Sequence, residues 1–470
     1  MSETFLHGVQ MVEVDTGARP IRTVTTAIIG LVGTAPNADP AVFPLNTPVV
    51  IAGSREKAKS LKVDKAVSTF TVDATANTFT KAGHGFVTGQ AVKLTVATGG
   101  TLPGGTALDT IYYLGVTGDA LKLYSTRSGA VEASSGQVID LANTGSGVLT
   151  MTVQHFLVGQ ESVESQPCGS LPFAVEAILQ QVGAVIVVVR VAGYTDISDG
   201  LDILKTAKGV TGYEPRILSA LWFGEVGDGI AVKLAQVTDE LRACSAANYN
   251  SPTDSESEAD GGAIGTARVK ILGPSKLRMS MFGGIYEIHA SAAWAGLRAK
   301  VDYEQGFWVS ESNKVIAGVV SISNLPTWSI GDPASEANQL NEKNVTTFIR
   351  ENGFRVWGNR GANGDFQSVQ RTRDIINDSV QRAHLWAVDR NIVKTYFEDV
   401  TEGVNAYLRN LISLGAITGG TCWPDPDLNT PQNIAQGKVY FNFDIGFAYP
   451  AEHVIFQSFI NDDYLNNLLK

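Results

Sequence analysis

The chain has few cysteines and no long apolar run, and both shortages exclude classes of protein. Its three cysteines, Cys168, Cys244 and Cys422, are odd in number, far apart and in no CxxC spacing. We therefore expect neither a disulfide framework nor a thiolate metal site, but buried small side chains. The longest aliphatic run, 183–189, falls far short of the roughly 20 residues of a spanning helix. It predicts a buried strand and no membrane insertion.

Positive charge is also scarce. The sequence has 36 Lys and Arg against 47 Asp and Glu, which gives a net charge of −11. General binding to a phosphate backbone needs clustered Lys and Arg, so we expect no direct nucleic-acid partner. The first residues contain no basic segment followed by an apolar one. This argues against a secretory signal and favours folding in a cytoplasm.

The motifs of the commonest enzyme classes are missing from the sequence. It has no phosphate loop, HExxH, GxSxG or Cys/His metal spacing. The glycines of 224–229 have a spacing reversed from that of a dinucleotide fingerprint, which favours a turn or a helix entry. Glu452 and His453 are an acid next to a base, but no nucleophile lies nearby in sequence. A structural hydrogen-bonding role fits this pair better.

One pattern near the C-terminus has the beginning of a calcium-binding loop. Asp425, Asp427 and Asn429 supply alternate oxygens, as such a loop requires. However, Thr430 and Gln436 occupy the positions that need Gly and Glu, which favours a solvated polar turn. We therefore predict no catalytic residue, no cofactor and no metal site.

The composition is that of a globular protein of two to four domains. Of the 470 residues, 44 % are apolar and 18 % are charged, which argues against disorder. Between 62 and 156 the sequence becomes rich in Thr, Gly, Val, Ala and Ser, with short alternating runs between turn clusters. This pattern predicts a small antiparallel β domain inserted into the body.

Outside this insertion, predicted strands and helices alternate, which indicates α/β layer packing. The strands are expected at 27–34, 49–51, 184–189, 216–221 and 315–323. The helices are expected at 199–207, 229–247, 288–301, 369–388 and 396–414, with Gly415 as the stop signal of the last one.

The segment 437–460 has the clearest strand pattern in the chain. Apolar and other residues alternate from Val439 to Phe447, the period of two that places one face on a core. Pro450 interrupts the pattern, and a second predicted strand follows at 454–460. Such a strand pair beside a chain end invites strand addition between chains. Residues 1–26 also alternate and predict an extended arm, with a turn at 17–20.

The predicted helix 369–388 carries charges along its outer face. They belong to Arg371, Arg373, Asp374, Asp378 and Arg382. A solvated face with (i, i+4) ion pairs would have this pattern. A docking surface for an oppositely charged partner would have it too, and both interpretations stay open.

Several stretches of the chain resemble the contractile tail sheath proteins of bacteriophages and of phage-tail-like bacteriocins. The likeness covers most of the chain except the predicted insertion, and the stretches follow the order of that family. They are HGVQMVEVDTGARPIRTVTTAIIGLVGTAPNAD near the start, FPLNTPVVI after it, AGLRAKVDYEQGFWVSESN at 295–313, LNEKNVTTFIRENGFRVWGNR at 340–360, RTRDIINDSV at 371–380 and PAEHVIFQ at 450–457.

The resemblance implies a structural protein and no enzyme. It implies a helical homopolymer of stacked hexameric rings around a tail tube, which contracts to drive the tube through the target cell envelope. The implied partners are further copies of the chain, the tail tube protein, and the baseplate and tail terminator proteins. The implied location is the virion tail, or a bacteriocin particle, after assembly in the host bacterial cytoplasm.

The resemblance also implies that terminal arms of neighbouring subunits add strands to a sheet in the C-terminal region. The candidates for this inter-subunit strand exchange are Val9, Met11, Val12, Val14, Val439, Phe441, Phe443, Ile445, Val454 and Phe456. Flexible links at 17–20 and 429–437 would let the subunits rotate while the pairing persists. The resemblance further implies that the tube is attached through the C-terminal part of the inner domain, so the charged helix 369–388 is a candidate for tube contact. The possible tube-facing residues are Arg371, Arg373, Asp374, Asp378 and Arg382.

The expected fold class is an α/β (mixed α+β) sheath core with extended N- and C-terminal β arms and an inserted all-β domain. The expected division is an N-terminal arm at 1–26, the start of the sheath core at 27–61, the insertion at 62–156, an α/β sheath domain at 157–345, a C-terminal core with long helices at 346–436 and the C-terminal strand pair and arm at 437–470.

Two alternatives remain. The first is an α/β enzyme or ligand-binding protein with an accessory β domain, and the second is a tail tube or baseplate subunit. A sheath protein should form polymers or rings, whereas the first alternative predicts a monomer even at high concentration.

Overall fold

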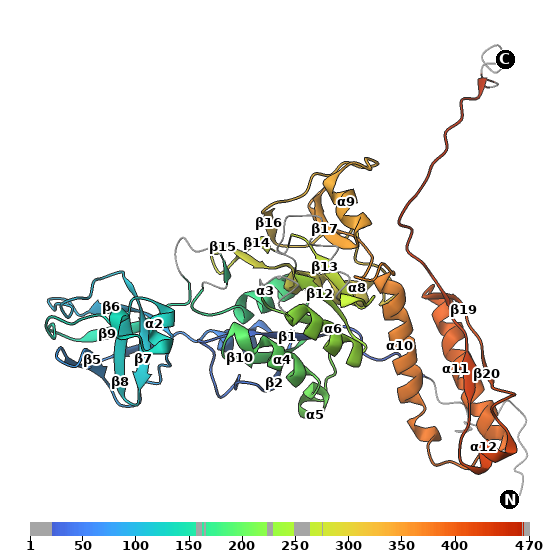
Figure 1. Ribbon diagram of the computed structural model, residues 1–470, viewed down its shortest axis with the longest axis horizontal. Coiled ribbons are helices and arrows are strands. Elements are labelled where there is room, and N and C mark those ends of the chain that lie inside the picture. Colours follow the sequence, from blue (N-terminus) through green and yellow to red (C-terminus); the bar gives the residue numbers. More distant parts are fainter. Residues whose placement is uncertain are drawn as a thin grey trace, which may run out of the picture.

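The computed structural model describes residues 21–156, 162–163, 166–222, 229–248, 264–274, 276–462 and 464. Figure 1 shows three parts in a row: a β module at one end, a sheet body in the middle, and a layer with two long helices at the other end. Residues 448–462 run away from all three as an extended segment. The predicted mixed α/β class is confirmed. The predicted arm residues 1–20 lie outside the described part of the chain.

An eight-stranded sheet forms the centre of the body, in the order β18-β17-β13-β12-β11-β1-β10-β2. The six inner strands run parallel, and β2 and β18 add antiparallel edges. Its strands are β1 (Ile28–Thr34), β2 (Pro48–Ala52), β10 (Val185–Val191), β11 (Ile217–Ala220), β12 (Cys244–Asn248), β13 (Val269–Leu272), β17 (Val345–Arg350) and β18 (Phe354–Trp357). The apolar runs of β1 and β10 suit inner parallel strands, which are buried on both faces. The predicted strands at 27–34, 49–51, 184–189 and 216–221 are confirmed.

Helices cover both faces of this sheet (Figure 1). One face packs on α3 (Leu171–Gln181), α8 (Ala290–Glu304) and the small sheet β15-β14-β16. The other face packs on α4 (Ile197–Leu204) and α6 (Ile230–Glu240). The small sheet consists of β14 (Lys276–Met281), β15 (Gly284–His289) and β16 (Val319–Ile322). Because α8 is buried almost all round, it is an interior helix rather than an amphipathic surface helix.

The prediction of a single helix over 229–247 is wrong in its second half. Helix α6 ends at Glu240, Arg242 has a positive φ of 47°, and β12 follows as an inner strand. The residues of β12, CSAAN, are small and fit closely beneath α8. A short apolar run of this kind does not distinguish a buried strand from the continuation of a helix.

The inserted module has its own antiparallel sheet and core. The sheet order is β3-β9-β6-β7-β8-β5-β4. Its strands are β3 (Ala66–Ser68), β4 (Thr71–Asp73), β5 (Thr78–Thr80), β6 (Ala91–Val96), β7 (Ile111–Thr117), β8 (Ala120–Tyr124) and β9 (Leu149–Val153). The expectation of an all-β domain is wrong in one respect, because α2 (Arg127–Glu132) packs on β7 and β8. Thr126 caps this helix by accepting a hydrogen bond from Gly129 N.

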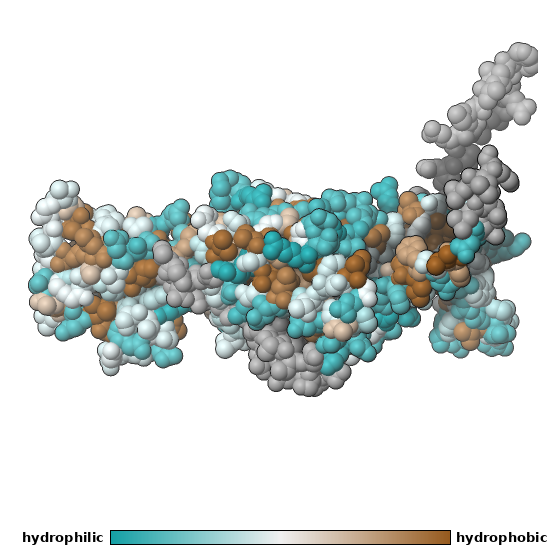
Figure 2. Space-filling view, turned by 90° about the horizontal axis from the view of Figure 1, so that it is seen from above, coloured by the Kyte–Doolittle hydropathy of each residue, from teal (hydrophilic) through white to brown (hydrophobic). Residues whose placement is uncertain are grey.

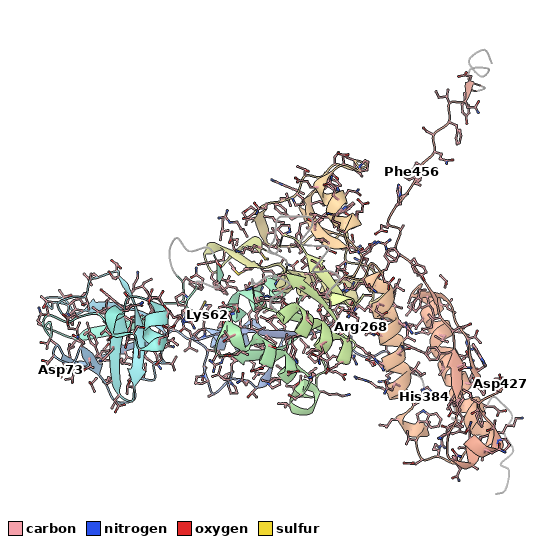
Figure 3. All side chains as sticks on the ribbon, viewed as in Figure 1. Lys62, Asp73, Arg268, His384, Asp427 and Phe456 are labelled. Carbon is pink, nitrogen blue, oxygen red and sulfur yellow. The ribbon has the colours of Figure 1, made fainter. Side chains whose placement is uncertain are left out.

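The module joins the body through a narrow neck (Figures 1 and 3). The ring of Phe156 lies 5.4 Å from that of Phe282 and 5.7 Å from that of Phe173, centroid to centroid. Lys62 Nζ lies 4.7 Å from the centre of the Phe282 ring. His155 contacts Asn37 of the body at 3.0 Å. His155 and Phe156 therefore pack against the body, and only the residues that precede them in the insertion belong to the module alone.

The C-terminal layer holds the two predicted long helices. They are α10 (Gln367–Ala383) and α11 (Lys394–Ser413), and Gly415 follows with a φ of 73°, as expected of a helix stop. The layer also contains β19 (Ile417–Gly419), β20 (Cys422–Pro424), α12 (Pro431–Ala435), β21 (Phe441–Phe443) and β22 (Gly446–Phe447). The remaining short helices are α1 (Arg55–Ala58), α5 (Ala207–Thr211) and α9 (Glu336–Glu342). Within the described ranges, no helix is long and apolar enough to cross a membrane.

Candidate interaction surfaces

The predicted strand 439–447 is two short strands with different partners. Strand β21 pairs with β20, and β22 pairs with β19. The pattern breaks at Asp444, whose carboxylate accepts a hydrogen bond from Thr421 N at 2.6 Å. This side-chain bond to the backbone competes with a continuous ladder. The prediction of one uninterrupted strand is therefore wrong, although the alternation does place one face on a core.

That core lies between α10, α11 and the short strands. Ile375 and Ile376 of α10 and Leu408 and Leu411 of α11 are buried in it. Three of the predicted exchange residues, Phe441, Phe443 and Ile445, are half-buried against this cluster. They are thus partly covered by their own subunit.

The C-terminal segment 448–462 is extended and projects from the body (Figures 1 and 3). In the described residues, 454–460 has no assigned strand partner, so the second strand predicted there is not formed within the subunit. Its apolar side chains are exposed: Phe456 is 92 % exposed, Phe459 84 % and Ile460 96 %. Apolar side chains on this scale are normally covered. We call residues 453–462 the C-terminal arm.

An apolar groove of about 730 Å³ opens beside β21. Its walls are the end of α10, the start of α11 and the segment 437–443. The lining includes Val388, Tyr396 and Val439. Val439 is the remaining predicted exchange residue of 439–445. Figure 2 shows apolar side chains on the surface at this end of the molecule, between hydrophilic ones.

The link predicted at 429–437 is not a flexible one. Helix α12 occupies its centre, and Thr430 caps this helix by accepting a hydrogen bond from Asn433 N at 3.3 Å. The side chain of Asn429 contacts the backbone of Tyr440 through both its oxygen and its nitrogen, at 2.9 and 2.8 Å. The turn-forming residues there were correctly identified, but their hydrogen bonds fix the segment.

The charged face of α10 is mostly buried, contrary to the expectation of an outer face. Arg371, Asp374 and Asp378 are buried, with between 3 % and 6 % of each residue exposed. Asp374 pairs with Arg268 through two bonds of 2.6 and 2.7 Å. Asp378 pairs with Arg216 and with Arg242. These three residues hold α10 on the sheet body, because Asp374 and Asp378 pair with arginines of the body and Arg371 pairs with Asp302 of α8.

The two other charged residues of α10 are exposed. Arg382 pairs with Glu214, whereas Arg373 lies on the open surface of the helix. The five charged residues of α10 thus fall into two groups. Three attach the helix to its own subunit, and two lie on the surface where a partner can reach them.

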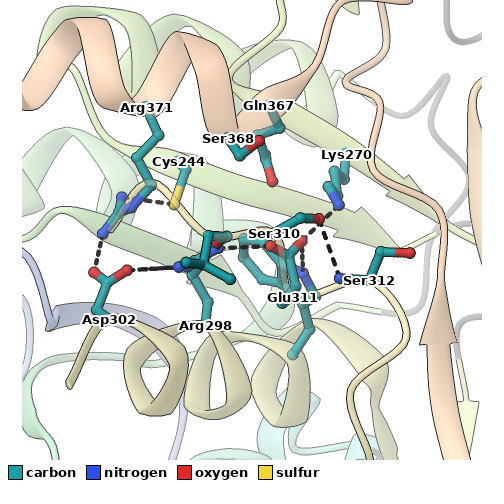
Figure 4. A network of polar contacts seen from close by, with 12 residues as sticks. Cys244, Lys270, Arg298, Asp302, Ser310, Glu311, Ser312, Gln367, Ser368 and Arg371 are labelled. Atoms are coloured by element: carbon teal, nitrogen blue, oxygen red, sulfur yellow. Dashed lines mark hydrogen bonds and ion pairs between the residues drawn. The ribbon is translucent and has the colours of Figure 1, made fainter. Parts of the chain in front are cut away.

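A buried ionic network continues inward from Arg371 (Figure 4). Asp302 pairs with Arg371 and, at 2.8 Å, with Arg298. Glu311 pairs with Arg298 at 2.8 Å and with Lys270 at 2.5 Å. All five side chains are at most 3 % exposed. The network joins α10, α8, β13 and the segment after α8 into one unit.

The network has three cations and two anions, and its charges set the protonation of its members. Burial by itself would raise the pKa of Asp302, yet the charges of Arg371 and Arg298 lower it below its ordinary value. Burial opposes ionisation of Glu311 as well, but Lys270 and Arg298 lower its pKa. Both carboxylates are therefore ionised at neutral pH.

Backbone and neutral groups satisfy the extra positive charge. Arg371 donates to the carbonyls of Arg216 and Thr26 at 2.9 and 3.0 Å. Lys270 donates to Gly358 O at 2.9 Å. On the anionic side, Glu311 accepts a further hydrogen bond from Trp294 Nε1 at 3.0 Å. Burying a charge is costly unless it is paired and hydrogen-bonded, and here each member is both.

The smaller sequence candidates have structural roles. Asp425 accepts hydrogen bonds from Asp427 N and Leu428 N at 2.9 and 2.7 Å, as a polar turn does. The described residues contain no cluster that could hold a metal ion. Glu452 bonds to Arg360 rather than to His453. The three cysteines are free and buried, as predicted.

Of the five network residues, the sequence pattern identifies only Arg371. Arg298, Asp302 and Glu311 all lie in the stretch 295–313, which was noticed only as a resemblance. A usable signal is present, because Arg298 and Asp302 are four residues apart and follow a helical stretch, 290–297, that carries no charge. Charges at such positions need partners inside the protein.

Comparisons with known proteins agree over most of the chain. The profile described as phage tail sheath protein central domain matches residues 198–362, and that of the phage tail sheath C-terminal domain matches 364–461. The tail sheath protein of Escherichia phage P2 is 30 % identical over 472 residues, which cover 98 % of this chain and 97 % of the relative. That of Burkholderia phage BcepMu is 28 % identical over 499 residues, covering 100 % and 99 %.

Solved structures share the fold over nearly the whole length. The sheath complex of an extracellular contractile injection system, PVC, in its contracted state has a TM-score of 0.58 and 14 % identity, and covers 99 % of this chain and 100 % of the other. The contracted helical sheath of the anti-feeding prophage has a TM-score of 0.56 and 14 % identity, with 97 % and 100 % covered.

Proposed function

The chain belongs to the family of phage tail sheath proteins and is a structural subunit of a tail sheath, and we propose that it acts as a contractile one. In this proposal it polymerises as stacked hexameric rings around a tail tube and contracts to drive the tube through a target cell envelope. The exposed C-terminal arm is the observation that carries the assembly part of the proposal. The alternative of an enzyme or a ligand-binding protein has no support from the relatives, and we propose that the subunit acts without catalysis.

The arm is suited to pairing with a second copy of the chain. Its seven residues 454–460 would span roughly 23 Å as a strand. Full burial of Phe456, Phe459 and Ile460 is worth about 1.5–3 kcal/mol each, or about 5–9 kcal/mol in all before ordering costs. Each ladder hydrogen bond adds about 0.5–1.5 kcal/mol. Ordering the seven residues costs about 1–2 kcal/mol each. One exchange therefore contributes at most a few kcal/mol net, and a stable polymer depends on its repetition in every subunit.

The acceptor in this proposal is the C-terminal layer of a neighbouring subunit. It offers two sheets of only two strands each, and such short sheets gain stability from further strands. The apolar groove beside β21 offers matching side-chain contacts. Val454 and Phe456 are the donor candidates, and Val439, Phe441, Phe443 and Ile445 belong to the acceptor. Val9, Met11, Val12 and Val14 remain proposed donors in a part of the chain that the structure does not describe.

Contact with the tube, if it uses α10, falls to the two exposed charges. Arg373 and Arg382 are accessible to a partner, whereas the buried Arg371, Asp374 and Asp378 are already paired within the subunit. Exposed charges of this kind would set orientation more than affinity. Besides the tube protein, the proposed partners are the baseplate and tail terminator proteins, and the proposed site of assembly is the host bacterial cytoplasm.

Truncation of the arm tests the assembly proposal. Purified full-length protein should form rings or tubular polymers in electron micrographs, and a chain ending at Glu452 should remain a folded monomer with an unchanged circular dichroism spectrum. Full-length protein that stays monomeric at high concentration would refute the proposal. Polymers of the truncated chain would refute the role of the arm.

A further inference from the structure

The root of the C-terminal arm is bound to the sheet body by a cluster of four side chains. The guanidinium of Arg360 binds the carboxylate of Glu452 at both oxygens, with Nε to Oε1 at 2.9 Å and Nη2 to Oε2 at 2.5 Å. The same guanidinium lies over the ring of Phe366, 4.5 Å from its centre. The ring of Tyr449 packs edge-on against the ring of Phe366, with the ring centroids 6.0 Å apart.

The segment that carries Arg360 and Phe366 is firmly held. Arg360 and Phe366 face each other across a turn as a β-bridge. Ala362 N donates to Val269 O of β13 at 2.8 Å. A Cβ at Gly361 would approach the backbone of Ala267 to 2.5 Å, so this turn lies directly on the body. Through this turn, Glu452 is therefore attached to the central sheet.

The arm root would otherwise depend on a weak element. Strand β22 has only two residues and a single short partner, β19. Four residues lie between the end of β22 at Phe447 and Glu452, and beyond Glu452 the side chains of 454–460 are exposed. Any pull on an exchanged arm reaches Glu452 before it reaches β22.

We propose that Arg360, Phe366, Tyr449 and Glu452 form a clamp that sets the direction in which the arm leaves the subunit and passes load from the arm to the central sheet. The proposal rests on the arm exchange put forward above. The residues are positioning residues for assembly. The clamp also connects two of the stretches that resemble tail sheath proteins, the one that ends at Arg360 and the one that begins at Pro450.

The contact geometry suits this task. A bidentate arginine–carboxylate pair fixes orientation as well as distance, and stacking on an aromatic ring holds the guanidinium plane. Arg360 is 36 % and Glu452 42 % exposed at the side chain, so the pair contributes little to overall stability. Its loss should therefore alter where the arm points without unfolding the subunit.

The experiment compares E452Q, the charge-reversed pair R360E/E452R, and the control E398Q. Glu398 forms an exposed pair with Lys394 on α11 at 3.5 Å, so the control removes the same charge from the same layer. Nitroxide labels at Q339C on α9 and Q457C in the arm report the arm direction, because pulsed electron paramagnetic resonance measures the distance between the two labels. The native cysteines are buried, so labelling should be confined to the two new ones.

We expect a narrow distance distribution in the unsubstituted full-length background and in E398Q, and a distribution at least twofold wider in E452Q. R360E/E452R should recover much of the narrow distribution. The critical concentration for polymer formation should rise about two- to fivefold in E452Q. Equal distributions and equal critical concentrations in E452Q and its parent would overturn the clamp, while polymer formation itself would still support arm exchange. A distribution that widens in E452Q, in a protein that never polymerises, would support the clamp's geometry and refute the proposed function instead.

Discussion

Replacement of Asp302 by Asn is the sharpest test of the buried network. Asp302 is 0 % exposed at the side chain and lies between two arginines, with Arg298 Nη2 at 2.8 Å and Nε at 3.1 Å. Asn keeps the size but removes the anion, which leaves both guanidinium groups short of a countercharge. Loss of one partner from a buried ion pair typically costs about 3–5 kcal/mol. We expect a loss in this range for D302N.

The corresponding fall in Tm follows from the size of the unit that unfolds. An unfolding entropy of roughly 2.1 cal/mol/K per residue, over about 300 residues of body and C-terminal layer, amounts to about 0.63 kcal/mol/K. A loss of about 3–5 kcal/mol therefore lowers Tm by about 5–8 °C. Differential scanning calorimetry on arm-truncated protein would measure it without interference from polymers.

The matched control is E304Q, on the same helix and exposed. It makes the same chemical change, and its effect should stay within about 0.5 kcal/mol. A Tm of D302N within 2 °C of the parent, as with E304Q, would refute the view that this network attaches α10 and α8 to the sheet.

Three further predictions concern pH, thiol reactivity and the inserted module. Burial lowers the pKa of His289 to about 3, whereas the pKa in the unfolded chain is near 6.5, so between these two pH values only the unfolded chain takes up this proton. The free energy of unfolding should therefore fall on acidification by up to about 1.4 kcal/mol per pH unit. The variant H289N should flatten this slope, as measured by urea titrations at several pH values. Burial raises the pKa of Cys168 to about 12 and those of Cys244 and Cys422 to about 11, so Ellman's reagent should label none of them in native protein and all three in denaturant, and rapid native labelling would contradict their burial. Replacement of 64–154 by a short Gly-Ser bridge should leave polymer formation intact, since β3 and β9 bring the two ends together; loss of assembly with the body still folded would assign the module to the subunit contacts.

The sequence predicted the elements whose pattern is local. The apolar runs of β1 and β10 and the long helices α10 and α11 all appear close to their predicted bounds. The inserted sheet was also foreseen, because Thr- and Gly-rich runs with regular turns are typical of antiparallel sheets. Only α2 was missed there, a helix too short to establish a helical period.

The errors arose where distant residues decide the outcome. Arg371, Asp374 and Asp378 have the spacing of a solvated helix face, but arginines and an aspartate from other elements make their burial possible. The segment 454–460 has a strand pattern, yet nothing in the described subunit pairs with it. Pattern alone does not reveal whether a strand finds its partner in the same chain or in another.

The clamp residues also could not be paired from local sequence patterns. Arg360 and Glu452 are 92 residues apart, and no local pattern links them. The sequence suggested His453 as the neighbour of Glu452 because the two are adjacent in the chain. Only the turn at 359–367 and its attachment to β13 bring the arginine into position.

A helical reconstruction of assembled full-length protein by electron microscopy tests the central claim most directly. The account predicts that residues 454–460 of each subunit lie as a strand against the C-terminal layer of a neighbouring subunit, with Phe456 covered. A map in which this segment folds back on its own subunit, or remains in solvent while the rings still form, would contradict it.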